Sequence, residues 1–284
     1  MPLGRLDRRL SYIVLFVGLV VVTVVFGVRA QYAPGVYYSL AVVQLTVISI
    51  AAWKLGASAV RAEAQDHRTL AVAGILLIAP FASFSFLAGF GPPWLATAPE
   101  NQLRFTILLI DAIAIAGGLV LLREALSKAG ERFYSALGFA AIMLAGPLYA
   151  IFAAIQLGFF RAIERAGPGQ ESPGISSLDE LSLILIYVGA VLTYLATAAF
   201  AAALGRTQWL GRTASRAFVG ASLLAVLCAG IKVAEALASP ENSMWGFERW
   251  YTAPGFALMI PAVPWIMPYL FGVGLLRRAG DAQR

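Results

Sequence analysis

Residues 103–122 read LRFTILLIDAIAIAGGLVLL, an apolar run with one carboxylate, Asp111, near its middle. As an α-helix, about 20 residues of this kind cross the hydrocarbon core of a bilayer. An unpaired Asp at that depth costs about 2.5–3.5 kcal/mol on insertion scales, so Asp111 is expected to face protein or trapped water rather than lipid. Ala114 and Gly118 lie on the same side of the helix and would let another helix come close. The run therefore predicts a membrane helix with a packing partner at Asp111.

The composition extends this prediction to the whole chain. Of its 284 residues, 60% are hydrophobic and 13% are charged, whereas a soluble domain carries about 25% charged residues. We therefore predict an all-α, polytopic membrane protein with a single transmembrane domain over residues 1–284. Eight segments are long enough to cross a bilayer, and they cover approximately residues 10–28, 37–60, 69–91, 103–122, 134–158, 181–204, 216–238 and 252–276.

The basic residues predict the orientation of these spans. Cytoplasmic loops carry an excess of Lys and Arg. With the N-terminus in the cytoplasm, every inner segment is richer in these residues than its outer neighbours. The inner side then receives Arg5, Arg8, Arg9, Arg61, Arg68, Arg123, Lys128, Arg132, Arg206, Arg212, Arg216, Arg277, Arg278 and Arg284. The outer side keeps Arg29, Arg104, Arg161, Arg165 and Arg249. The prediction is a bacterial-type inner-membrane protein with both termini in the cytoplasm.

Several classes of site are excluded or disfavoured by residue counts. The single cysteine, Cys228, excludes an intrachain disulfide and a cysteine-based metal cluster. The single histidine, His67, lies in a polar loop, which excludes a bis-His haem site. The net charge of +6 is explained by the short basic loops, so no nucleic-acid partner is expected. We expect no metal and no cofactor.

Two further charged residues lie within the predicted seventh span. Lys232 and Glu235 are three residues apart and share a helix face. At 1.5 Å per residue, Asp111 lies about 12 Å below the outer end of its span and Lys232 about 9 Å below. The comparable depths predict an Asp111–Lys232 pair in the outer half of the bundle, provided that the two spans touch.

Other polar residues fall at a similar depth. Tyr149 and Gln156 are seven residues apart in the fifth span and therefore share a face. Together with Asp111, Lys232 and Glu235, these residues are the candidate ion- or substrate-binding set, which also includes Gln44 and Tyr187. One interpretation is a polar cavity open to the outside. The other is a set of interhelical hydrogen bonds, each worth about 0.6 kcal/mol.

Prolines mark the last predicted span. The sequence MIPAVPWIMPYLF contains Pro261, Pro264 and Pro268. Each proline removes a backbone donor and frees carbonyl groups that need other partners. We predict a strong bend there, which in a transporter would serve as a gate.

Three classes of function are compatible with these features. The first is a transporter or channel for a small solute or ion, which the charged intramembrane residues favour. The second is an accessory, sensory or assembly subunit that acts through helix contacts, with a homo-oligomer or a membrane partner subunit. The third is a membrane enzyme on a lipid or isoprenoid substrate. No catalytic residue is assigned, because the sequence has no intramembrane His, no paired acidic motif and no Gly-x-Ser-x-Gly motif. The lipid bilayer is the one partner common to all three.

Overall fold

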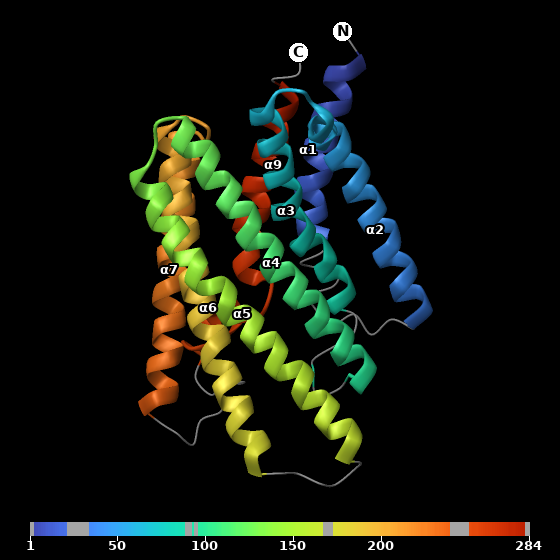
Figure 1. The fold of residues 1–284 in the computed structure, drawn as a ribbon, viewed down its shortest axis with the longest axis vertical. Helices are drawn as coiled ribbons and strands as arrows, with labels where there is room; N and C mark the ends of the chain where they lie inside the picture. The colour runs from blue at the N-terminus through green and yellow to red at the C-terminus, as the bar shows by residue number, and fades with distance from the viewer. Residues whose placement is uncertain are drawn as a thin grey trace.

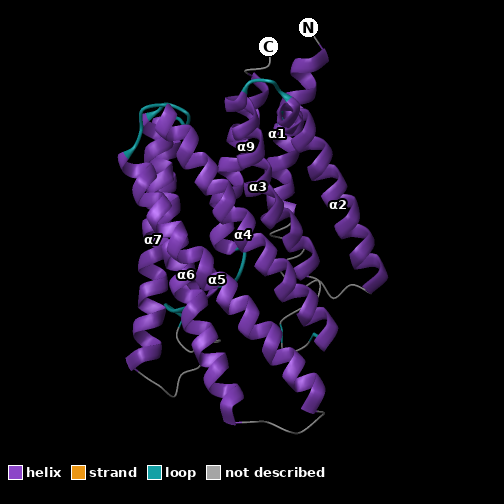
Figure 2. Cartoon of the chain, viewed as in Figure 1, coloured by secondary structure: helices purple, strands orange, loops and turns teal. Residues whose placement is uncertain are grey.

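The computed structural model describes residues 3–21, 34–88, 93, 96–166, 173–238 and 250–281. Figure 2 shows helices joined by loops, and no strand, in these ranges. The first four α-helices are α1 (Leu3–Val21), α2 (Pro34–Leu55), α3 (Gln65–Ala88) and α4 (Ala98–Lys128). The next three are α5 (Phe133–Ala166), α6 (Pro173–Arg206) and α7 (Arg212–Ala238). The last described α-helices are α8 (Ala253–Met259) and α9 (Ile266–Asp281). The described residues also form the short 3₁₀ helices η2 (Ala57–Arg61) and η3 (Val263–Trp265).

The all-helical prediction is confirmed for the described residues, and the eight spans are confirmed only in part. Among the described residues, five helices are long and apolar enough to cross a membrane, namely α2, α4, α5, α6 and α7. The bent pair of α8 and α9 gives a sixth if it counts as one span. The predicted spans 10–28 and 69–91 end outside the described residues. The predicted span 37–60 is shorter as an α-helix, because α2 ends at Leu55 and η2 follows.

The predicted last span is not one continuous helix. The two helices of this segment are bent by 71° relative to each other. Between them, Ala262 adopts a left-handed backbone conformation with φ 78°, which is uncommon for a residue with a side chain. Pro261 and Pro264 flank this residue, so the predicted bend is confirmed here. Pro268 lies within the first turn of α9, where its missing N–H costs no helical hydrogen bond.

The helices form two groups on either side of α4 (Figure 1). One group contains α1, α2, α3 and α9, and the other contains α5, α6, α7 and α8. The described ends of the chain meet at one end of the bundle, where Arg8 donates to Asp281 at 2.9 Å and to the carbonyl of Leu55 at 3.0 Å. We call this the basic end. It also holds η2, the ends of α4 and α6 and the start of α7 (Figure 1).

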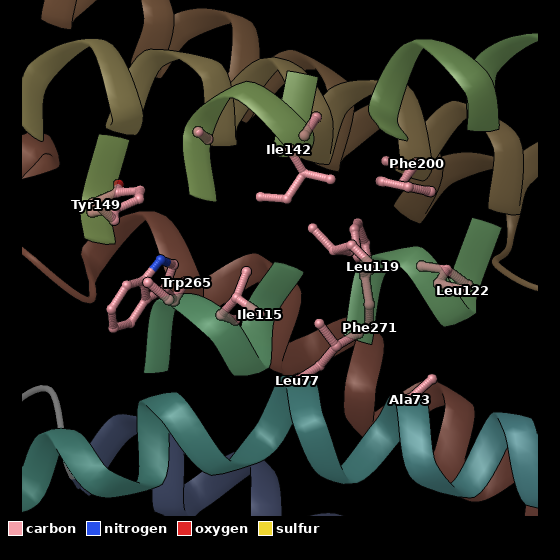
Figure 3. Close-up of a cluster of buried hydrophobic side chains, with 14 of the residues drawn as sticks. Ala73, Leu77, Ile115, Leu119, Leu122, Ile142, Tyr149, Phe200, Trp265 and Phe271 are labelled. Atoms are coloured by element: carbon pink, nitrogen blue, oxygen red, sulfur yellow. The ribbon is translucent and has the colours of Figure 1, made fainter. Parts of the chain in front are cut away.

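A buried apolar cluster joins the two groups. Figure 3 shows Leu77 of α3, Leu119 of α4, Phe200 of α6 and Phe271 of α9 in this cluster. The α3–α9 crossing is close because it is built on glycines: a side chain at Gly272 would lie 2.8 Å from the carbonyl oxygen of Gly74. Small residues permit such contact between helices in a membrane. Helix α3 is therefore held between α4 and α9.

Candidate functional site

The carboxyl group of Asp111 lies inside the bundle at the interface of α3 and α4. Asp111 is 5% exposed, and its Oδ2 lies 2.6 Å from the hydroxyl oxygen of Ser83. The same hydroxyl lies 2.7 Å from the carbonyl oxygen of Pro80, one turn earlier in α3. No ion pair to Asp111 is formed by the residues that the structure describes. Asp111 therefore faces protein, and its partner there is a serine.

The two short contacts of Ser83 constrain its protons. A hydroxyl group carries one proton, so Ser83 can donate either to Pro80 or to Asp111 but not to both. Both contacts become hydrogen bonds when Asp111 carries a proton and donates to Ser83, which then donates to Pro80. When Asp111 is ionised, the Ser83 proton must turn towards the carboxylate. The protonation of Asp111 therefore determines whether Ser83 donates its proton to the carbonyl of Pro80 in α3.

The second buried charge cluster lies on α7. Lys232 is 1% exposed, and its Nζ lies 3.1 Å from Oε2 of Glu235. The other carboxylate oxygen of Glu235 is buried and has no hydrogen-bond partner among the described residues. Helix α8 covers Lys232, because a side chain at Gly255 would lie 2.8 Å from its Cβ and would also overlap the carbonyl oxygen of Cys228. A buried ion pair is thus enclosed between α7 and the broken segment.

Asp111 and Lys232 are not ion-paired to each other. The depth comparison placed them at a similar level, but helix packing gives each a different neighbour. Helix α4 packs mainly against α3 and α5, whereas α7 packs against α6 and α8. Lys232 therefore pairs with Glu235, and Asp111 contacts Ser83. In the structure, the predicted pair is replaced by two separate charged sites.

The break between α8 and α9 is supported by aromatic residues. The hydroxyl of Tyr194 in α6 donates to the carbonyl of Leu258 at 2.8 Å, a group that would otherwise accept from Ala262 in a continuous helix. Trp265 of η3 is 1% exposed and its ring centroid lies 5.6 Å from that of Tyr149 (Figure 3). The cluster around Trp265 also contains Ile115, one turn after Asp111. The break therefore reaches the same buried core to which α4 contributes Ile115.

The remaining candidate residues are spread over the bundle. Gln156 donates to Ser182 at 2.7 Å and so connects α5 to α6. Tyr187 is buried in the apolar cluster. The hydroxyl of Tyr149 and the side-chain nitrogen of Gln44 are buried without hydrogen-bond partners in the described part of the chain. Because Gln44 lies on α2, which packs against α1 and α3, these residues do not gather around Asp111 and Lys232.

Several polar features were not predicted as parts of a site. Arg104 is buried, and it donates to Asn101 at 3.0 Å near the start of α4. The sequence indicated only that Arg104 lies on the outer side. Its position three residues after Asn101, on the same helix face, is the feature that could have indicated this contact. Several arginines that were used only to predict the orientation of the spans surround a cavity at the basic end. This cavity is lined by Arg206, Arg212 and Arg216.

Neither a metal site nor a known relative guides the assignment. No group of three or more His, Cys, Asp or Glu side chains that could hold a metal ion occurs within the described residues. No protein-family model, curated protein or solved structure matches the chain.

Proposed function

We propose that this chain is a multi-pass membrane transporter for a small solute or ion, and that Asp111 binds and releases the coupling proton. The observation that carries the proposal is the Asp111–Ser83–Pro80 arrangement, a buried carboxyl group with a hydroxyl partner and no basic partner among the described residues. Ionisable residues inside membrane helices are costly and mark ion and proton pathways. A buried carboxylate without a basic partner is costly to stability when it is ionised, so its presence is better explained by a role in function.

The packing of α3 supports a link between this proton and a conformational change. Ser83 and Pro80 belong to α3, and α3 also contacts α9 through Gly74 and Gly272. Helix α9 continues the broken segment that contains Trp265. A change in the Ser83 hydrogen bond would thus act on the helix that lies between the proton site and the break. Broken helices beside buried polar groups are a common element of transporter sites.

The proposed orientation places the basic end in the cytoplasm. Described arginines and lysines gather there on α1, η2, α4, α6, α7 and α9. Aromatic side chains at this end lie under arginines, among them Trp53 under Arg61, Tyr134 under Arg206, Tyr12 under Arg277 and Trp209 under Arg278. Basic and aromatic residues of this kind are typical of a cytoplasmic membrane interface. Asp111 is 17 residues, or about 25 Å of helix, from the end of α4 at this face. It is 13 residues from the start of α4, so the proposed proton site lies near the middle of the helix and slightly closer to the opposite side.

Proton binding can be measured before the substrate is known. The full chain is reconstituted into liposomes on a solid-supported membrane, and the charge displacement after a jump in pH is recorded. We expect a transient current from the wild-type protein, because protons enter a site inside the bundle. Asp111→Asn should reduce this current to that of protein-free liposomes, since the side chain of asparagine is not titratable.

Asp66→Asn is the matched control. Asp66 is exposed at the basic end and pairs with Lys128 at 3.0 Å, so the same chemical change there should leave the current unchanged. A current from Asp111→Asn equal to that of the wild type would contradict the proposal.

A further inference from the structure

A second site lies at the basic end, far from Asp111. A cavity of about 580 Å³ opens between α5, α6 and α7, and its polar wall contains Arg206, Arg212 and Arg216. All three side chains are exposed. None of them has an acidic partner among the described residues, and no carboxylate lines the cavity. Three guanidinium groups in one cavity therefore have no charge compensation from the parts of the protein that are described.

Local packing holds these arginines together. A side chain at Gly205 would overlap Ser215, so α6 and α7 are in close contact directly beside the cavity. The hydroxyl of Ser215 donates to the carbonyl of Ala201 at 2.8 Å, which fixes the start of α7 to the end of α6. Arg206 also lies over the ring of Tyr134, 5.5 Å from the ring centroid. The packing of α6 against α7 therefore forms this cavity.

The chemistry of this wall fits a phosphate group. Guanidinium groups bind phosphate oxygens through paired, charge-assisted hydrogen bonds. Arg212 is also the first residue of α7, where free backbone N–H groups and the helix dipole favour an anion.

An apolar surface continues from the cavity along α7. Val219 and Gly220 line the cavity one turn beyond Arg216, and they are followed on the same face by Leu223 and Leu227, which are 50% and 60% exposed. Residues at this spacing share one side of a helix. The surface provides a place for acyl chains below a phosphate held by the arginines.

From this arrangement we infer that the cavity binds a phosphate-bearing anion. The adjoining apolar surface favours the headgroup of an anionic phospholipid as the source of the phosphate. Basic pockets between membrane helices on the cytoplasmic side are suited to anionic headgroups. Free phosphate is the other source of the same chemistry.

The test uses the full chain in detergent and native mass spectrometry, with dioleoylphosphatidylglycerol and dioleoylphosphatidylcholine as probes. We expect wild-type protein to bind phosphatidylglycerol more tightly than phosphatidylcholine. The triple variant R206Q/R212Q/R216Q should weaken phosphatidylglycerol binding by about tenfold or more, because it removes the three charges of the wall. The matched control R9Q/R68Q/R132Q removes three exposed charges outside the cavity and should keep the affinity.

Two further measurements distinguish a lipid headgroup from free phosphate as the ligand. Gly220→Phe keeps the arginines and fills the apolar part of the cavity, where a Cβ has no neighbour within 4 Å. For a lipid, this variant should weaken phosphatidylglycerol binding, and excess inorganic phosphate should not displace the lipid. Displacement of the lipid by inorganic phosphate, with binding of inorganic phosphate that depends on the three arginines, would identify free phosphate as the ligand and still support the site.

The inference is overturned if the triple variant binds phosphatidylglycerol as tightly as the wild type, or if the control variant loses as much affinity. Size-exclusion chromatography and circular dichroism verify that each variant is folded. If the triple variant does not fold, the single variants R212Q and R216Q replace it, and unchanged affinity in both would also overturn the inference.

Discussion

Replacing Glu235 by Ala is expected to lower the free energy of unfolding by about 3–5 kcal/mol. Lys232 is almost fully buried and lies 3.1 Å from the Glu235 carboxylate. The variant leaves the ammonium group of Lys232 inside the bundle without this carboxylate. The change can be measured by titrating the purified protein with sodium dodecyl sulfate in mixed micelles and following tryptophan fluorescence.

The double variant K232M/E235L is the control for this prediction. It replaces both charges by apolar side chains of similar length, which is often neutral or stabilising at buried ion pairs. We expect it to recover most of the stability that Glu235→Ala loses. If Glu235→Ala costs less than about 1 kcal/mol, the Lys232–Glu235 pair is not the buried interaction described above.

Trp265→Ala is the second substitution with a large expected effect, also about 3–5 kcal/mol. The indole of Trp265 is 1% exposed and fills the core at the break, beside Tyr149. Its removal leaves a cavity where η3 contacts the rest of the bundle, and the surrounding helices can close this cavity only in part. The same detergent titration measures the loss.

Trp250→Ala is the matched control, because the Trp250 side chain is 85% exposed. We expect a change within about 0.5 kcal/mol for this surface position. Equal effects of the two substitutions would show that η3 does not lie in the core as described.

The sequence predicts the local features of this fold well. Apolar runs of the length of 103–122 specify helices regardless of their neighbours, and α4 does cover this run. The prolines at 261 and 264 predict the break, because the loss of backbone donors is a property of the residues themselves. The basic residues likewise indicate which helix ends share a side. In each case the physical cause lies within a short stretch of sequence.

The partner of each buried charge could not be predicted in the same way. Depth along a helix follows from residue number, but it does not say which helix lies opposite. The depth of Lys232 was suitable for Asp111, but the packing of α3 against α4 gives Asp111 a different partner, Ser83. The sequence also gave no sign that Gly255 brings α8 onto Lys232. Long-range contacts of this kind depend on the whole bundle.

The role of the arginines at the basic end was hidden for another reason. Arg206, Arg212 and Arg216 fit the charge bias expected of the loop that is predicted from the sequence to be cytoplasmic, and this explanation needs no binding site. Their grouping around one cavity depends on the close contact of Gly205 with Ser215. One set of residues can serve both topology and binding.

The most direct test of the central claim is the free energy of unfolding of Asp111→Asn compared with wild type. An asparagine amide can donate to Ser83 as a protonated Asp111 would, and Ser83 can still donate to Pro80. If Asp111 is kept for proton binding, the variant should be as stable as the wild type or more stable, as is common when a functional residue is replaced. A loss of about 2 kcal/mol or more would contradict the account, because it would make Asp111 a structural residue.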